Sequence, residues 1–190
     1  MNPSSNPARI LTLLDRHLHY RFRLYIYGRS AIALGYSESP SEMHATLDVD
    51  AILPASEVGA IESNDDFWTA QEKVNEELGE SGLYFTHLFE DRQVILTPNW
   101  QSKAVKVRGL DLQWLEVWRP STIDLVLTKM MRVDPEDRAD IEFLVRQNDF
   151  DAEEMLTAFD DAIVPPVPEI QDAFSKNQQW LKTVLENDSL

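Results

Sequence analysis

Two aspartates, Asp48 and Asp50, lie one residue apart in an otherwise apolar run, Leu47-Asp48-Val49-Asp50-Ala51. In a strand, alternate side chains point to the same face, so we expect both carboxylates on one face and Leu47 with Val49 on the other. Like charges held this close repel each other unless a cation lies between them. Because carboxylate oxygens are ligands that suit Mg²⁺, the pattern indicates a magnesium site on a sheet. A solvated turn or an exposed edge strand can carry the same sequence.

A second segment whose residues could take part in the chemistry, Gly28-Arg29-Ser30, precedes this run. Residues 24–27 predict a buried strand, the glycine breaks it, and residues 31–34 predict a short helix. Glycine lets the backbone turn sharply, and the amides and hydroxyl at a helix N-terminus can hold phosphate oxygens. We therefore expect this turn to contact phosphate close to the aspartate pair.

The composition is that of a chain that folds. Its 190 residues suit one globular domain, with room for a helical appendage, and 43% of them are hydrophobic. No run approaches the roughly 20 apolar residues that cross a bilayer, and the N-terminus has no secretory pattern, so we expect a cytoplasmic protein without a membrane partner. The absence of cysteine excludes disulfides, thiolate zinc sites and cysteine nucleophiles.

The net charge restricts the class of partner. Lysine and arginine number 17 against 33 aspartates and glutamates, which gives a net charge of −16. Binding to a polyanion needs positive side chains that release counterions from phosphates, so we expect no nucleic-acid partner. A metal ion and a few local cations can still offset the negative charge of one nucleoside triphosphate. The acidic chain can also attract a basic protein over long range.

Capping residues and apolar spacing predict helices along the chain. Ser5-Asn6-Pro7 supplies a cap and a first turn, after which apolar residues recur at helical spacing. Residues 63–66 and 134–137 open two further helices in the same way. A proline-rich break at 164–168 precedes the last helix and would let it pack on a protein partner or on a second copy. The expected helices cover 7 to about 19, 31–34, about 67–79, 121 to about 132, 135 to about 148 and about 170–185.

Short apolar runs between turn residues predict a mixed β-sheet. The polar segment 35–45 predicts a loop that leads to the aspartate strand. Strands mixed with helices, followed by a helical C-terminal third, predict an α+β (α/β-like) fold with a mixed sheet flanked by helices. The strand-like runs are 24–27, 47–51, 83–85, 94–96, 104–107 and 115–118.

Four segments form an ordered pattern over about residues 20 to 145. They are Tyr27-Gly28-Arg29-Ser30-Ala31, Thr46-Leu47-Asp48-Val49-Asp50, Asp124-Leu125-Val126-Leu127-Thr128-Lys129-Met130 and Glu136-Asp137-Arg138-Ala139-Asp140-Ile141. In this order they resemble the minimal nucleotidyltransferases of the DNA polymerase β superfamily, and more narrowly the bacterial branch related to AbiEii-type toxins of toxin and antitoxin pairs.

The resemblance implies a nucleotidyltransferase fold in which Gly28, Arg29 and Ser30 hold the triphosphate of a nucleoside triphosphate. It also implies that Asp48 and Asp50 bind Mg²⁺ for transfer of a nucleoside monophosphate to a hydroxyl acceptor. Residues 1–118 would form the core with its N-terminal helix, 119–163 a helical part that completes the site, and 164–190 a proline hinge with a terminal helix.

Three further residues match the toxin-like branch. Lys129 falls where that branch places a lysine, which implies contact with the triphosphate or the substrate. Asp137 and Asp140, three residues apart on one helical face, match the same signature. An ordinary surface lysine, and acids that suit the dipole at a helix start, are the alternative interpretations.

Three departures from the family pattern bear on activity. Arg29 stands where the family usually has a second small residue, and it can either keep phosphate from the backbone or replace amide contacts with its guanidinium. The interval from the turn to Asp48 is longer than in compact members. A third metal-binding carboxylate is not evident. The candidates for it are Glu90, which we favour as a catalytic residue, Asp91 and Glu116.

Two functions stay open at this point. The first is a nucleotidyltransferase that uses Mg²⁺ and a nucleoside triphosphate. The second is a catalytically degenerate member that acts as a binding or regulatory subunit, such as one half of a toxin and antitoxin pair, and a purely structural interaction protein is a third. The four histidines fit no zinc spacing. His44, two residues before Thr46, is the histidine placed to meet a substrate phosphate.

Overall fold

The computed structural model describes residues 5–147 and 149–188, without the side chains at positions 86, 87, 187 and 188. The chain forms two compact units. One, here called the sheet unit, comprises residues 1–90 and 104–119, and the other, the helical unit, comprises residues 91–103 and 120–190. The predicted boundary after residue 118 lies next to the boundary at 119, whereas the predicted separate segment 164–190 is part of the helical unit.

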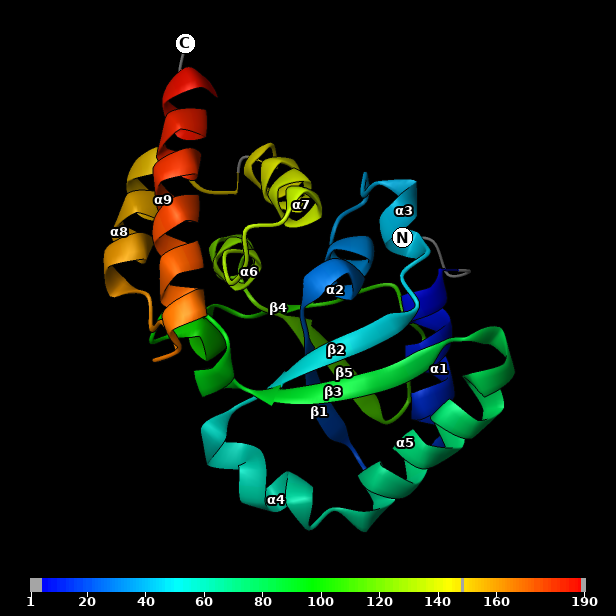
Figure 1. Ribbon diagram of the computed structural model, residues 1–190. Helices are drawn as coiled ribbons and strands as arrows, with labels where there is room; N and C mark the ends of the chain where they lie inside the picture. The colour runs from blue at the N-terminus through cyan, green and yellow to red at the C-terminus, as the bar shows by residue number, and fades with distance from the viewer. Residues whose placement is uncertain (1–4, 148, 189–190) are drawn as a thin grey trace. The chain divides into compact units, whose positions relative to one another are not determined.

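The sheet unit is built on five strands in the order β3-β2-β1-β5-β4 (Figure 1). β1 pairs antiparallel with β2 and parallel with β5. β2 pairs parallel with β3, and β4 pairs antiparallel with β5. The predicted mixed sheet is therefore confirmed. The strands are β1 (Phe22–Ile26), β2 (Asp48–Leu53), β3 (Tyr84–Glu90), β4 (Val105–Lys106) and β5 (Leu115–Arg119).

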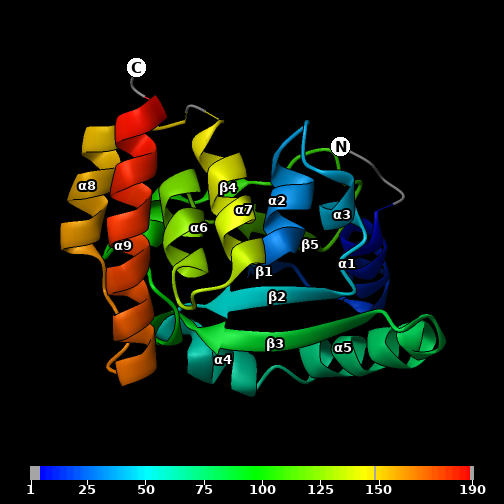
Figure 2. The same cartoon turned by 45° about the horizontal axis from the view of Figure 1, so that its top comes forward.

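Helices predicted from capping patterns flank this sheet (Figures 1 and 2). Ser5 caps the first one, because its hydroxyl accepts from the N–H of Ala8 at 3.4 Å. Asn64 caps another by accepting from the N–H of Phe67 at 3.0 Å. Such caps satisfy amides that a helix start leaves without a partner. The α-helices of the sheet unit are α1 (Asn6–His17), α2 (Gly28–Gly35), α3 (Ser41–His44), α4 (Val58–Glu62) and α5 (Asp65–Leu78), of which α3 lies in the segment predicted as a loop.

Aromatic side chains join α5 to one face of the sheet. The Phe67 ring of α5 stacks on Phe22 of β1 with ring centroids 4.4 Å apart, and it packs edge-on against Phe85 of β3 at 6.1 Å. Phe85 pairs in the sheet with Val49 of β2, and these side chains are buried. Burial of each large apolar side chain contributes about 1.5–3 kcal/mol. Because Val49 points to this core, the aspartates on either side of it point to the opposite face.

A buried carboxylate ties α1 to the start of β5. Asp15 is 7% exposed. Its oxygens accept hydrogen bonds from the backbone N–H groups of Gln113 at 3.0 Å, Trp114 at 2.7 Å and Leu115 at 2.7 Å. Hydrogen bonds to an ionised acceptor are shorter and stronger than neutral ones. One side chain of α1 therefore fixes the backbone where β5 begins.

The helical unit confirms the predicted helical C-terminal part. Ser121 and Asp134 cap two of its helices, and Asp151 with Glu154 forms a reciprocal capping box at a third. The predicted helix end near Asn148 falls outside the described residues. The α-helices are α6 (Thr122–Lys129), α7 (Pro135–Val145), α8 (Ala152–Asp161) and α9 (Pro168–Asp188).

A buried amide attaches α9 within the helical unit. Asn177 is fully buried, and its Nδ2 donates to the carbonyl oxygens of Met130 at 3.3 Å and Arg132 at 2.9 Å. Its Oδ1 accepts from Nε of Arg138 at 3.2 Å, and the guanidinium of Arg138 lies 4.8 Å from the centroid of the Trp180 ring. The terminal helix therefore packs on its own unit.

The predicted strand at 94–96 is wrong. Within the described part of the chain, only Leu96 of this run forms a β-bridge, an isolated one with Ile163. All three side chains of the run are buried, so its apolar character reflects packing and not strand pairing. The next residue, Thr97, donates from its N–H and its hydroxyl to Oδ1 of Asp124, at 2.8 and 2.9 Å. These two bonds attach the loop to α6.

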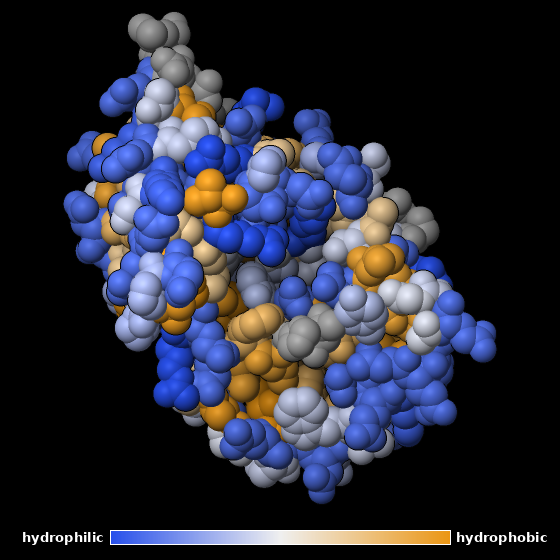
Figure 3. All heavy atoms as spheres, viewed as in Figure 1, coloured by the Kyte–Doolittle hydropathy of each residue, from blue (hydrophilic) through white to orange (hydrophobic). Residues whose placement is uncertain are grey.

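The solvent side of α5 is strongly hydrophilic (Figure 3). Glu72, Glu76 and Glu77 of this helix are all exposed. Acids of this kind contribute to the net charge of −16 without entering the interior. Among the helices that the structure describes, none combines the length and the apolar character needed to span a bilayer.

Candidate functional site

Asp48 and Asp50 open β2 and present their carboxylates on the same side of the sheet, opposite the buried Val49. Both side chains are half-buried. The hydroxyl of Thr46 donates to Oδ1 of Asp48 at 3.2 Å, which orients that carboxylate at the start of the strand. The strand therefore holds two acids side by side on a surface that is only partly open to water.

The turn at Gly28 adjoins the same strand. Gly28 has a φ of 63°, which is the left-handed region that glycine adopts at little cost. Directly before it, the backbone N–H of Tyr27 donates to the carbonyl oxygen of Asp50 at 3.1 Å. β1 thus runs beside β2 up to the turn, and α2 begins where the aspartate strand passes (Figure 2). The structure brings the two predicted motifs together.

Ser30 holds the turn from within. Its hydroxyl donates to the carbonyl oxygen of Tyr27 at 2.8 Å, and the residue is 2% exposed. The hydroxyl is therefore used by the fold, while the first amides of α2 have no side-chain cap. Backbone amides at a helix start can hold an anion, so phosphate contact at this turn would come from N–H groups. Arg29, half-buried, is the second residue of the helix.

Two residues beyond the predicted ones lie beside the aspartate pair and the turn. Thr46 orients Asp48, and the Tyr27 ring packs edge-on against Phe89 of β3, with ring centroids 5.9 Å apart. Strand alternation places Tyr27 on the face that carries the aspartates. In the sequence, only the positions of these residues pointed to the site. Tyr27 directly precedes Gly28, and Thr46 lies two residues before Asp48.

Glu90, the expected third carboxylate, ends β3 beside Leu53 of β2. Neighbours in a sheet point to the same face, so Glu90 shares the face of Leu53 and Val49 and not the face of the aspartate pair. The same rule places Glu116, which neighbours Arg23 of β1 in the sheet, on the face of Tyr25 and therefore of the aspartate pair. Asp91 begins a short 3₁₀ turn, and Glu116 on β5 forms ion pairs with Lys106 and Arg23 at 3.2 and 3.6 Å.

The donor set fits one type of metal. Within the described ranges, no group of three or more His, Asp or Glu side chains is arranged to hold a metal ion. Mg²⁺ is commonly held by one or two carboxylates, with substrate phosphates and water as its other ligands. A pair of aspartates beside a phosphate-binding turn matches that requirement, whereas a metal that needs a complete protein cage would find too few ligands.

Lys129, expected to contact the triphosphate, lies inside the helical unit. Its Nζ donates to Asp137 at 2.9 Å and to Asp140 at 2.7 Å, and its side chain is 11% exposed. Both aspartates are nearly inaccessible, with side chains 5% and 2% exposed. The lysine therefore joins the end of α6 to α7 through a buried ion-pair cluster, a structural role that differs from the predicted contact with the triphosphate.

Asp137 also binds Arg132, whose Nε donates to Oδ2 of the carboxylate. Burial alone would raise the pKa of Asp137, but the hydrogen bonds and positive charges of Arg132 and Lys129 outweigh it and lower the pKa below its usual value. The carboxylate is therefore ionised at neutral pH, and the cluster is a charged one.

Three of the four histidines have side-chain partners. His17 contacts Glu77 at 2.6 Å, and His19 contacts Asp66 at 2.7 Å. Nε2 of His44 lies 3.1 Å from the Ser39 hydroxyl, within the segment that leads to β2. The side chain of His87 lies outside the described part of the chain. The expected contact of His44 with a substrate phosphate stays a prediction.

Comparison with known proteins adds one finding to this geometry. A family model described as "Nucleotidyltransferase of unknown function (DUF6036)" matches residues 8–167. That range includes the turn, the aspartate strand and the Lys129 cluster, and the match supports a general nucleotidyltransferase function. No curated protein and no solved structure matches the chain.

Proposed function

Because the chain belongs to the DUF6036 family of nucleotidyltransferases, we propose that it transfers a nucleoside monophosphate from a nucleoside triphosphate to a hydroxyl acceptor. The observation that carries this proposal is the hydrogen bond from the N–H of Tyr27 to the carbonyl oxygen of Asp50, 3.1 Å long. It joins a turn suited to phosphate to a pair of acids suited to a metal. Nucleotidyl transfer needs these two elements next to each other.

Each element has a role in the proposed reaction. The backbone amides that follow Gly28, with the guanidinium of Arg29, would bind the triphosphate. Asp48 and Asp50 would hold Mg²⁺, which when bound would neutralise charge on the phosphate oxygens. The acceptor oxygen forms a bond to the α-phosphorus, the bond from that phosphorus to the departing pyrophosphate breaks, and the hydroxyl proton passes to solvent. The protein supplies position and electrostatics.

Label transfer tests the proposal. The chain is incubated with Mg²⁺, a cell extract and each α-labelled nucleoside triphosphate in turn, and labelled products are separated by size. We expect one labelled product with the wild type and none with the double variant Asp48→Asn, Asp50→Asn. The pair Glu72→Gln, Glu76→Gln removes the same charge from exposed positions on α5 and should label as the wild type does. Equal labelling by both double variants would refute the role of the aspartates.

Two observations favour a second candidate function. The hydroxyl of Ser30 is used by Tyr27, and the described residues hold no group of three metal-binding acids or histidines. A chain of this kind could be a degenerate nucleotidyltransferase that acts as a binding or regulatory subunit, for example in a toxin and antitoxin pair of the AbiEii-like type. Affinity purification from the source cells separates the two candidates, because only this second function predicts a partner retained equally by the wild type and by Asp48→Asn, Asp50→Asn.

A further inference from the structure

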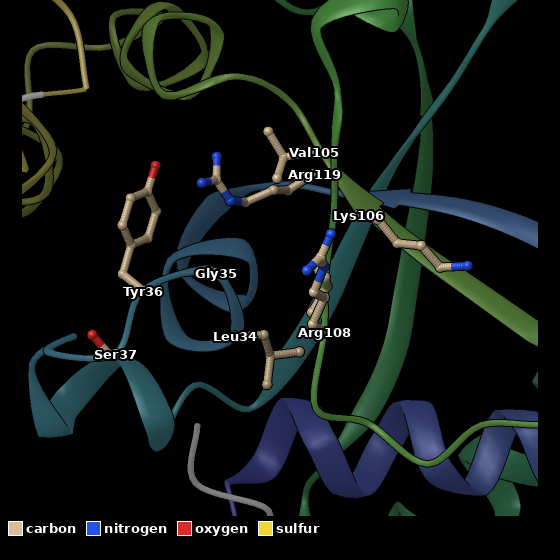
Figure 4. Close-up of a pocket in the computed structure, with 9 residues that line it drawn as sticks. Leu34, Gly35, Tyr36, Ser37, Val105, Lys106, Arg108 and Arg119 are labelled. Atoms are coloured by element: carbon tan, nitrogen blue, oxygen red, sulfur yellow. The ribbon is translucent and has the colours of Figure 1, made fainter.

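A pocket of about 350 Å³ lies at the C-terminal end of α2, within the sheet unit (Figure 4). It is lined by residues 34–37 of α2 and its end, by residues 105–108 of β4 and the following loop, and by Arg119 of β5. Three of these residues are lysine or arginine and none is acidic. In a chain with 33 acids against 17 bases, this is a concentration of positive charge.

Arg119 is the fixed cation of this pocket. It is 7% exposed, and its guanidinium lies 4.4 Å from the centroid of the Tyr36 ring. A Cβ atom at Gly35 would lie 2.5 Å from Nε of Arg119, so only a glycine leaves room for the guanidinium at this place. Figure 4 shows the side chain reaching from β5 toward Tyr36. A buried charge held in this way is little screened by salt and is already oriented for a ligand.

Arg108 is the second cation, and it is exposed. It forms no hydrogen bond or ion pair in the part of the chain that the structure describes. Lys106 differs, because its Nζ donates to Glu116 at 3.2 Å and its side chain points away from Tyr36 (Figure 4). Because the lysine is directed away from Tyr36, the two guanidinium groups that line the pocket are the candidates for binding an anion here.

Two guanidinium groups beside an apolar wall indicate the chemical class of the ligand. Guanidinium forks bind phosphate in a bidentate manner, and a phosphomonoester carries a charge of about −1.5 to −2 at pH 7, which two arginines match. The C-terminus of α2 carries a partial charge of about −0.5, which repels an anion. The positive charge of the two guanidinium groups is larger than this partial charge. Val105, 44% exposed, and Leu34 offer apolar contact for a carbon skeleton. The volume lies at the lower end for small-molecule sites and is too small for a polymer.

We propose that this pocket, here called the arginine pocket, is a second ligand site that binds a small phosphomonoester between Arg108 and Arg119. The site is separate from the aspartate pair and needs no metal ion. It is therefore independent of the proposed transfer reaction, and it gives an acidic protein a place for a phosphorylated metabolite.

Calorimetric titration with phenyl phosphate in the presence of EDTA tests the proposal, with benzoate as the carboxylate probe. We expect phenyl phosphate to bind without Mg²⁺ and more tightly than benzoate. Arg108→Gln should weaken binding by about tenfold or more, because it removes a charge-assisted hydrogen bond. Lys73→Gln is the matched control, since it removes the same charge from an exposed residue on α5 that does not line the pocket, and it should leave the affinity unchanged.

Two further variants test the fixed cation. Gly35→Ala should weaken phenyl phosphate binding by displacing Arg119, while Asp48→Asn with Asp50→Asn should bind the probe as the wild type does. Thermal unfolding checks that each variant folds. If Gly35→Ala does not fold, the binding measured for Arg108→Gln, a change at an exposed position, decides the outcome. No binding of phenyl phosphate, equal affinity in Arg108→Gln, or binding that requires Mg²⁺ would each overturn the proposal.

Discussion

The backbone N–H of Tyr27 lies 3.1 Å from the carbonyl oxygen of Asp50, and this main-chain bond joins the turn to the aspartate strand. No side chain takes part in it. A change at either carboxylate therefore removes charge from the site without removing the contact that assembles it. This separates the chemistry of the site from its folding, and it makes conservative substitutions informative.

Backbone strain at the turn can be measured directly. A Cβ atom at Gly28 would meet no heavy atom within 4 Å, so Gly28→Ala should destabilise only through its φ of +63°. We expect a loss of about 1–2 kcal/mol in the free energy of unfolding, and a smaller loss for Gly28→Asn. Gly59→Ala in α4 is the control, because its Cβ is also free of contact and alanine favours helix. Equal effects of the two alanine variants in urea unfolding would contradict this account of the turn.

Lys129→Met should destabilise the helical unit. It leaves Asp137 and Asp140 buried without their shared cation, and removal of one partner from a buried ion pair typically costs about 3–5 kcal/mol. Arg132→Gln should cost less, because that side chain is 72% exposed and solvent replaces it. Urea unfolding of both variants gives the comparison. A stable Lys129→Met protein with weakened nucleotide binding would instead support the original assignment of Lys129 to the triphosphate.

The same cluster predicts acid sensitivity. Folding lowers the pKa of Asp137 below its usual 3.8, so its contribution to stability is complete above that pH and is lost as the pH falls through the lowered value. The free energy of unfolding should therefore fall less steeply below about pH 4 in Asp137→Asn than in the wild type. Asp160→Asn, at an exposed position on α8, should keep the wild-type slope. If the free energy of unfolding had the same slope against pH in all three proteins, Asp137 would not contribute to the acid sensitivity.

Asp15→Asn tests the anchor of β5. The carboxylate accepts from three backbone N–H groups, and an uncharged amide can accept from fewer of them and more weakly. We expect a loss of about 2–4 kcal/mol in the free energy of unfolding, from one or two charged hydrogen bonds. Glu72→Gln on the exposed side of α5 removes the same charge and should change stability by less than about 0.5 kcal/mol. Amide hydrogen exchange at residues 113–115 should rise only in Asp15→Asn.

Local patterns predicted much of the fold. The caps Ser5, Asn64 and Asp134 lie within three residues of the amides they bind, so the helix starts could be read from the sequence. The turn at Gly28 and the shared face of the two aspartates follow from backbone rules of the same short range.

Contacts between distant residues could not be predicted in this way. Asp15 meets its partners across 98 to 100 positions of sequence, and nothing local distinguishes it from a surface acid. Residues 94–96 were apolar enough for a strand, but their burial serves packing. Glu90 could be assigned to a face only from the register of β3 against β2, which the sequence does not contain.

The central claim is that Asp48 and Asp50 hold a metal-bound nucleotide beside the Gly28 turn, and calorimetric titration with nucleoside triphosphates, with and without Mg²⁺, tests it most directly. The wild type and Glu90→Gln should bind one triphosphate only when Mg²⁺ is present, and Asp48→Asn with Asp50→Asn should lose this binding while its thermal unfolding stays close to that of the wild type. Mg²⁺-dependent binding of undiminished affinity in the double aspartate variant would contradict the account.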